Sequence, residues 1–131
     1  MAAVKLIYSV LSGTYAICRL NPDAAIPPWA VHAQQFYSIT RTPDELSIVW
    51  PEQSVPKEAK ASRGWMCLKL QGPFAFSDTG ILTSFVDPLS QHGIPVFAIS
   101  TFDTDYVLIE QKSWPAAFDV LRSAGHNHVP E

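Results

Sequence analysis

The sequence GIPVFAISTFDTDYVLIE, residues 93–110, decides the predicted fold of this chain. Two short apolar runs, residues 96–99 and 106–109, flank a polar insert at residues 100–105. Short apolar runs bounded by turn-forming residues are typical of buried strands, and two so close together predict a β-hairpin. The Ser and Asp side chains of the insert can bond the backbone and close a turn. The same carboxylates and hydroxyls could instead contact a ligand, and the insert alone leaves both interpretations open.

An amphipathic helix is predicted on each side of this hairpin. Before it, apolar residues recur over residues 81–89 with the spacing of one helix face, and Ser77 and Asp78 are the expected N-terminal caps. Pro88 lies inside this helix, where it removes one backbone hydrogen bond. After the hairpin, Ser113 is expected to cap a second helix. Helices and paired strands therefore alternate in this half of the chain.

The order of these elements predicts an α+β fold. With a strand at residues 65–70, the order is β-α-β-β-α, and one more strand would complete a ferredoxin-like unit, with helices on one face of an antiparallel sheet. Residues 14–70 have the same order with degraded helices, one of them a turn near residues 29–33. We therefore predict two tandem ferredoxin-like units, residues 1–63 and residues 64–131.

The N-terminal strands carry two further predictions. The apolar runs at residues 6–11 and 15–20 are separated by Ser-Gly-Thr, which predicts another hairpin or a bulged turn. The first run is also a candidate for exchange between the units, because a shared strand would supply the sixth element that the second unit lacks.

Composition narrows the class of protein. The 131 residues are 47% hydrophobic and 16% charged with a net charge of −3, which indicates a globular chain without the clustered Lys and Arg of a nucleic-acid-binding protein. The first apolar run is too short for a signal sequence or a membrane span, so we expect a cytoplasmic protein that binds no membrane. Cys18 and Cys67 are expected to be small core residues in a reducing compartment, although the sequence leaves a disulfide between them open.

Three strings of sequence resemble a known family. They are TRTPDELSIV at residues 40–49, GILTSF at residues 80–85 and GIPVFAISTFDTDYVLI at residues 93–109. They are similar to small bacterial proteins built from two ACT domains, which are related to the aspartate kinase regulatory region and to the CASTOR arginine sensors. The resemblance extends over about residues 15–125.

The resemblance implies a function. ACT domains are ferredoxin-like modules that bind small molecules, often amino acids, at interfaces between paired domains. This chain has no kinase segment, so the resemblance implies a freestanding sensor without catalytic activity and without a cofactor. The sensors carry four ACT units in one chain, and a homodimer of this chain would restore that number.

The resemblance also implies a set of ligand-binding residues. They come from the loop that enters the first helix and from the hairpin insert: Asp78, Thr79, Gly80, Ile81, Thr101, Phe102 and Asp105. In the sensors the loop meets the carboxylate and amine of the amino acid, and the acidic residue at the position of Asp105 contacts its cationic part. Elementary chemistry agrees, because the N-terminus of a helix attracts a carboxylate and Gly80 allows close approach of the backbone.

The same residues allow other interpretations. Asp78 could be only a helix cap and Gly80 an ordinary helix entry. The whole chain could be an interaction module that binds no ligand and dimerises through its sheets and helices. His126 and His128 lie in a polar tail that we expect to be solvated, and no metal site is predicted there.

Overall fold

The chain folds into two compact units. The computed structural model describes residues 4–30, 33 and 35–131. The N-terminal unit is Gly13–Trp65, and the C-terminal unit combines Met66–Glu131 with the chain up to Ser12. The predicted division between residues 63 and 64 falls inside a strand, β5 (Ala61–Leu70), that contributes residues to both units.

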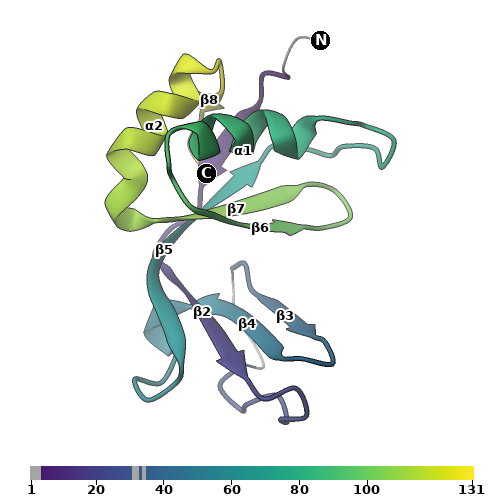
Figure 1. Ribbon diagram of the computed structural model, residues 1–131, viewed down its shortest axis with the longest axis vertical. Coiled ribbons are helices and arrows are strands. Elements are labelled where there is room, and N and C mark those ends of the chain that lie inside the picture. The colour runs from purple at the N-terminus through teal and green to yellow at the C-terminus, as the bar shows by residue number, and fades with distance from the viewer. Residues whose placement is uncertain (1–3, 31–32, 34) are drawn as a thin grey trace. The chain divides into compact units, whose positions relative to one another are not determined.

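The C-terminal unit contains the predicted hairpin and both helices (Figure 1). Besides the second half of β5, its elements are β1 (Ile7–Val10), α1 (Ile81–Gln91), β6 (Val96–Ser100), β7 (Asp105–Glu110), η2 (Gln111–Ser113), α2 (Trp114–Ser123) and β8 (Asn127–His128). The strands pair in the order β6-β7-β5-β1-β8. The hairpin is confirmed, because β6 and β7 are antiparallel from Val96↔Ile109 to Ser100↔Asp105. Strand β8 is the sixth element that the ferredoxin-like order lacked.

Strand β1 is inserted between β5 and β8. It runs antiparallel to β5, with Tyr8 opposite Leu70, and parallel to β8, with Tyr8 opposite His128. The segment chosen as a candidate for strand exchange therefore completes the sheet of the C-terminal unit. The predicted hairpin of residues 6–11 with residues 15–20 is wrong, since β1 pairs with β5 and β8, β2 pairs with β4 and β5, and β1 and β2 do not pair with each other. Burial of the Tyr8 ring in the C-terminal core favours this arrangement over a local turn.

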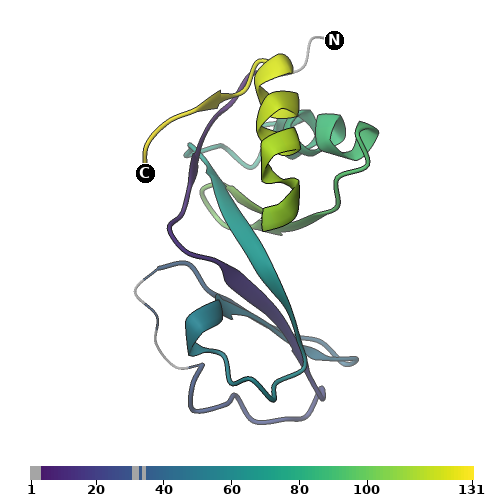
Figure 2. The ribbon, with the colours of Figure 1, turned by 90° about the vertical axis from the view of Figure 1, so that its left-hand side faces the viewer.

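The core of the C-terminal unit lies between its sheet and its two helices. Helices α1 and α2 lie side by side, and β8 leads from α2 to the C-terminus (Figure 2). Each helix has one apolar face, and the side chains buried from them are Phe85, Leu89, Ala117 and Leu121. Complete burial of one large apolar side chain stabilises a fold by about 1.5–3 kcal/mol. Neither helix of the described chain is long and apolar enough to span a bilayer.

The N-terminal unit repeats the strand order with much shorter helices. Its elements are β2 (Tyr15–Leu20), β3 (Ser38–Arg41), β4 (Leu46–Pro51), η1 (Glu52–Ser54) and the first half of β5. They pair in the order β3-β4-β2-β5, and each pair is antiparallel. The turn predicted near residues 29–33 lies partly outside the described residues; its described part closes where the Ala30 N–H donates to the Pro27 carbonyl.

The predicted helix caps are wrong. Helix α1 begins after Gly80, whose φ of 77° is the left-handed conformation that glycine adopts readily, and no side chain caps the helix. The Asp78 carboxylate accepts instead from the Ala75 N–H at 2.8 Å, three residues back in its own loop. Ser113 precedes α2 as predicted, but its hydroxyl makes no capping bond. The Asp78 side chain is therefore held by a backbone N–H of its own loop and not by the N-terminus of α1.

Candidate ligand-binding site

The loop of the β6–β7 hairpin is closed by its own threonines. The Thr101 N–H donates to the Thr104 carbonyl at 2.8 Å, and the Thr101 hydroxyl donates to the same oxygen at 3.1 Å. The Thr104 hydroxyl donates to the Leu70 carbonyl at 2.6 Å, which fixes the loop to the end of β5. The insert is therefore a turn, as one interpretation of the sequence had it, but Thr101 closes it where Ser and Asp side chains were expected to.

A second loop, residues 71–80, lies against this hairpin loop. The Phe74 N–H donates to the Asp103 carbonyl at 2.7 Å. A Cβ atom at Gly72 would lie 2.7 Å from the same oxygen, so the two backbones approach more closely than any side chain would allow. The hairpin loop and the loop before α1 are thus held together by main-chain contacts.

Between the two loops is an open hollow of about 250 Å³. Its lining comes from the loop before α1, the first residue of α1 and the hairpin loop: Phe74, Ala75, Phe76, Asp78, Ile81, Ser100, Thr101, Phe102, Asp103, Thr104 and Asp105. Five of the seven predicted ligand-binding residues are in this lining. The other two, Thr79 and Gly80, are not, although Gly80 sets the backbone conformation from which α1 starts.

The hollow is acidic. Three carboxylates line it, those of Asp78, Asp103 and Asp105, and no Lys or Arg does. The Asp105 carboxylate accepts from the Ser100 hydroxyl, whereas the Asp103 carboxylate has no partner among the described residues. The two oxygens of a carboxylate together accept about four hydrogen bonds, so each of the three carboxylates can still accept from a ligand. The arrangement suits an ammonium or guanidinium group.

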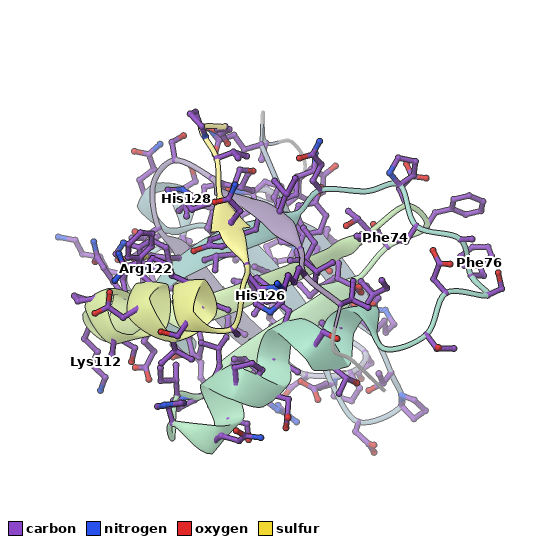
Figure 3. The ribbon with its side chains drawn as sticks, turned by 90° about the horizontal axis from the view of Figure 1, so that it is seen from above. Phe74, Phe76, Lys112, Arg122, His126 and His128 are labelled. Atoms are coloured by element: carbon purple, nitrogen blue, oxygen red, sulfur yellow. The ribbon has the colours of Figure 1, made fainter. Side chains whose placement is uncertain are left out.

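Two exposed aromatic rings stand at this hollow. Phe76 is 78% exposed and Phe102 is 76% exposed, and their ring centroids lie 4.8 Å apart at an interplanar angle of 72°. Phe76 extends outward from its loop, and Phe74 lies closer to the strands (Figure 3). Aromatic faces attract cations, which adds to the effect of the carboxylates. Large exposed rings that contact each other are also typical of surfaces that become covered on binding.

The first turn of α1 supplies the opposite charge. Because no side chain caps α1, the N–H groups of its first turn remain free to donate to a ligand. Ile81, the first helical residue, lines the hollow. A helix N-terminus carries a partial positive charge that favours a carboxylate. One face of the hollow therefore suits an anion and the rest suits a cation.

Sequence reasoning missed several of these residues. Phe76 and Asp103 were not selected, although both are neighbours of predicted positions. The available signal was the pair Phe74 and Phe76 after Gly72, because two phenylalanines at alternate positions of a Gly- and Asp-containing loop are unusual. In the structure Phe74 packs against the core and Phe76 stays exposed. Within the described residues, no three His, Cys, Asp or Glu side chains gather closely enough to hold a metal ion.

Comparison with known proteins identifies the family. The ACT domain model matches residues 60–123, and a model of a separate N-terminal domain matches residues 13–58. A solved protein of Agrobacterium tumefaciens is 44% identical, and the match covers 98% of this chain and 96% of that one with a TM-score of 0.92. This chain belongs to the ACT-domain family.

More distant matches include an arginine sensor and an aspartate kinase. The bovine cytosolic arginine sensor for mTORC1 subunit 1 is 27% identical over 114 residues, which are 73% of this chain and 35% of that protein. The chain thus spans about a third of the length of this curated relative. Aspartate kinase of Clostridium acetobutylicum is 10% identical with a TM-score of 0.66; the match covers 93% of this chain and 35% of that one, and shows the fold alone. The predicted relation to both groups is confirmed.

Proposed function

We propose that this ACT-domain protein binds a small amino acid, with a preference for a cationic side chain, in the hollow between the hairpin loop and α1. The observation that carries the proposal is the set of three carboxylates without a lining Lys or Arg. The uncapped N-terminus of α1 would receive the α-carboxylate of the ligand. The α-ammonium and a cationic side chain would then meet Asp78, Asp103 and Asp105.

The proposed role is regulatory and not catalytic. A ligand regulates a protein only if it binds two arrangements with different affinity. The hollow is open, so a second ACT unit could close it over the ligand. The two exposed Phe rings support this arrangement, because a second unit would cover them. The second unit would come from a homodimer in the cytoplasm. Occupancy would then favour the dimer in which the hollow is covered.

Calorimetry with the twenty amino acids at millimolar concentration tests the proposal. We expect heat from Arg or Lys and a weaker signal from neutral amino acids. Asp103→Asn should weaken binding about tenfold, because it removes a charge without breaking any bond of the hairpin. Asp105→Asn should weaken binding too. Asp119→Asn is the matched control, since Asp119 is an exposed carboxylate of α2 paired with Arg122.

Two results would contradict the proposal. One is the absence of heat from all twenty amino acids with folded protein. The other is equal affinity in the wild type and in Asp103→Asn. The exposed Phe pair also fits the second candidate function, a module that docks another protein without a ligand. In that case Phe102→Ser would abolish association while both Asp variants kept it.

A further inference from the structure

The N-terminal unit contains a second hollow, of about 310 Å³, beside Trp29. Its apolar lining comes from the end of β2, from the turn after β2 and from the segment before β5: Cys18, Leu20, Trp29, Pro56 and Ala59. We propose that this hollow binds a small aromatic carboxylate. The site lies wholly within residues 13–65, and no residue of the proposed amino-acid site contributes to it.

The hollow exists because the N-terminal unit lacks full helices. The inward side chains of β2 alternate, with Ala16 and Cys18 buried in the core of this unit. In the C-terminal unit two helices of ten or more residues cover the corresponding core, whereas here the described cover is a turn ending at Ala30 and the three-residue η1. Trp29 packs edge-on against Trp50, with ring centroids 6.2 Å apart, and remains only partly buried.

The charge around this hollow is positive. Arg19 and Lys60 line it, and Arg63 donates to the carbonyl of the lining residue Pro56 at 2.8 Å. Glu58 is the acidic residue in the lining. Burial raises the pKa of the Cys18 thiol, and the Arg63 charge lowers it in part, so the guanidinium acts on the base of the hollow. The lining therefore has two cations and one anion, and Arg63 adds a third cation next to it, a balance that favours an anionic ligand.

The volume and the apolar lining of the hollow indicate the size and the ring of the ligand. Small-molecule sites have volumes of about 300–1,000 Å³ and mostly apolar walls with a few polar groups that fix orientation. A hollow of about 310 Å³ admits a molecule with one ring. A planar ring can lie against Trp29, and a carboxylate is the anion that a guanidinium or an ammonium group recognises.

Titration with 3-phenylpropionate, followed by NMR of the tryptophan indole N–H signals, tests the inference. The chain has four tryptophans, and Trp29→Phe assigns the signal of interest. We expect saturable shifts of the Trp29 signal and none of Trp114, which belongs to the C-terminal unit. The amide 3-phenylpropanamide should bind at least about threefold more weakly, since it lacks the charge.

Matched variants locate the site. Ala59→Phe should fill the hollow and abolish the shifts, whereas Ala25→Phe, at an exposed position of the same unit outside the lining, should leave them. Lys60→Gln should weaken binding and Lys57→Gln should not. Equal binding of acid and amide would overturn the carboxylate specificity. Unsaturable shifts, or shifts that persist in folded Ala59→Phe, would overturn the site itself.

Discussion

At the scale of single residues, two glycines near the candidate site have different physical roles. Gly80 has a φ of 77°, and a Cβ atom there would meet nothing within 4 Å, so its constraint is conformational. At Gly72 the constraint is space, since a Cβ would lie 2.7 Å from the Asp103 carbonyl oxygen. The sequence pointed to Gly80 through its place before a helix. It could not point to Gly72, whose partner is distant along the chain.

Alanine substitutions should separate these roles. Gly80→Ala should cost about 1–2 kcal/mol of unfolding free energy, the price of a left-handed conformation for an L-residue. Gly72→Ala should cost about 1–3 kcal/mol through overpacking, and it should also displace the hairpin loop and weaken ligand binding. Urea unfolding measures the first effect, and amide shifts of Asp103 and Thr104 measure the second. Unchanged amide shifts in Gly72→Ala would show that the two loops do not depend on each other.

At the scale of elements, the C-terminal segment has a role that the sequence did not indicate. His126 was expected in a solvated tail, yet it is 4% exposed. Its Nδ1 accepts from the Leu6 N–H at 3.1 Å, and its Nε2 lies 2.7 Å from the Ser84 carbonyl. That carbonyl lacks its usual helical donor because residue 88 is proline. The His126 imidazole, which precedes β8, therefore connects the residue before β1 with α1 (Figure 3).

His126→Ala should destabilise the C-terminal unit. It leaves the Leu6 N–H and the Ser84 carbonyl without partners, and a buried unpaired polar group costs about 1–3 kcal/mol. Urea unfolding monitored by circular dichroism gives the loss. His92→Ala is the control, because His92 bonds the Pro88 carbonyl from an exposed position. A loss no larger than that of the control would mean that water replaces the imidazole.

At the scale of the whole molecule, the order of elements was predictable, whereas the pairing of strands that are far apart in sequence was not. Apolar periodicity and turn residues act within about ten positions, so the β6–β7 hairpin and both helices follow from local patterns. The insertion of β1 beside β5 depends on Tyr8 and Leu70, which are far apart in sequence. For the candidate site, the sequence predicted the positions of Asp78 and Asp105 through resemblance. It did not predict the contact between Gly72 and the hairpin loop that forms the hollow.

Strand β5 belongs to both units and should therefore couple their unfolding. Its residues pair with β2 in the N-terminal unit and with β1 in the C-terminal unit, so loss of either sheet removes partners from the same strand. Cys18 and Cys67 are free, buried thiols that report on the N-terminal and C-terminal units respectively. Burial raises the pKa of both thiols, that of Cys67 to about 12. Both should therefore resist alkylation at pH 8 in the native state, because the thiolate is the reactive form.

We expect the two thiols to become reactive over the same range of urea concentration. Cys18→Ala and Cys67→Ala isolate each thiol, and mass spectrometry after brief alkylation measures the reacted fraction. Because the pKa of Cys67 is higher in the folded state, its contribution to the free energy of unfolding is complete below about pH 9 and is lost as the pH rises toward 12. At pH 8, ionisation of this thiol therefore does not itself destabilise the fold. Reaction of Cys18 at a clearly lower urea concentration than Cys67 would show that the N-terminal unit opens alone. Its thinner cover, a turn and η1 in place of helices, would then set its stability independently of β5.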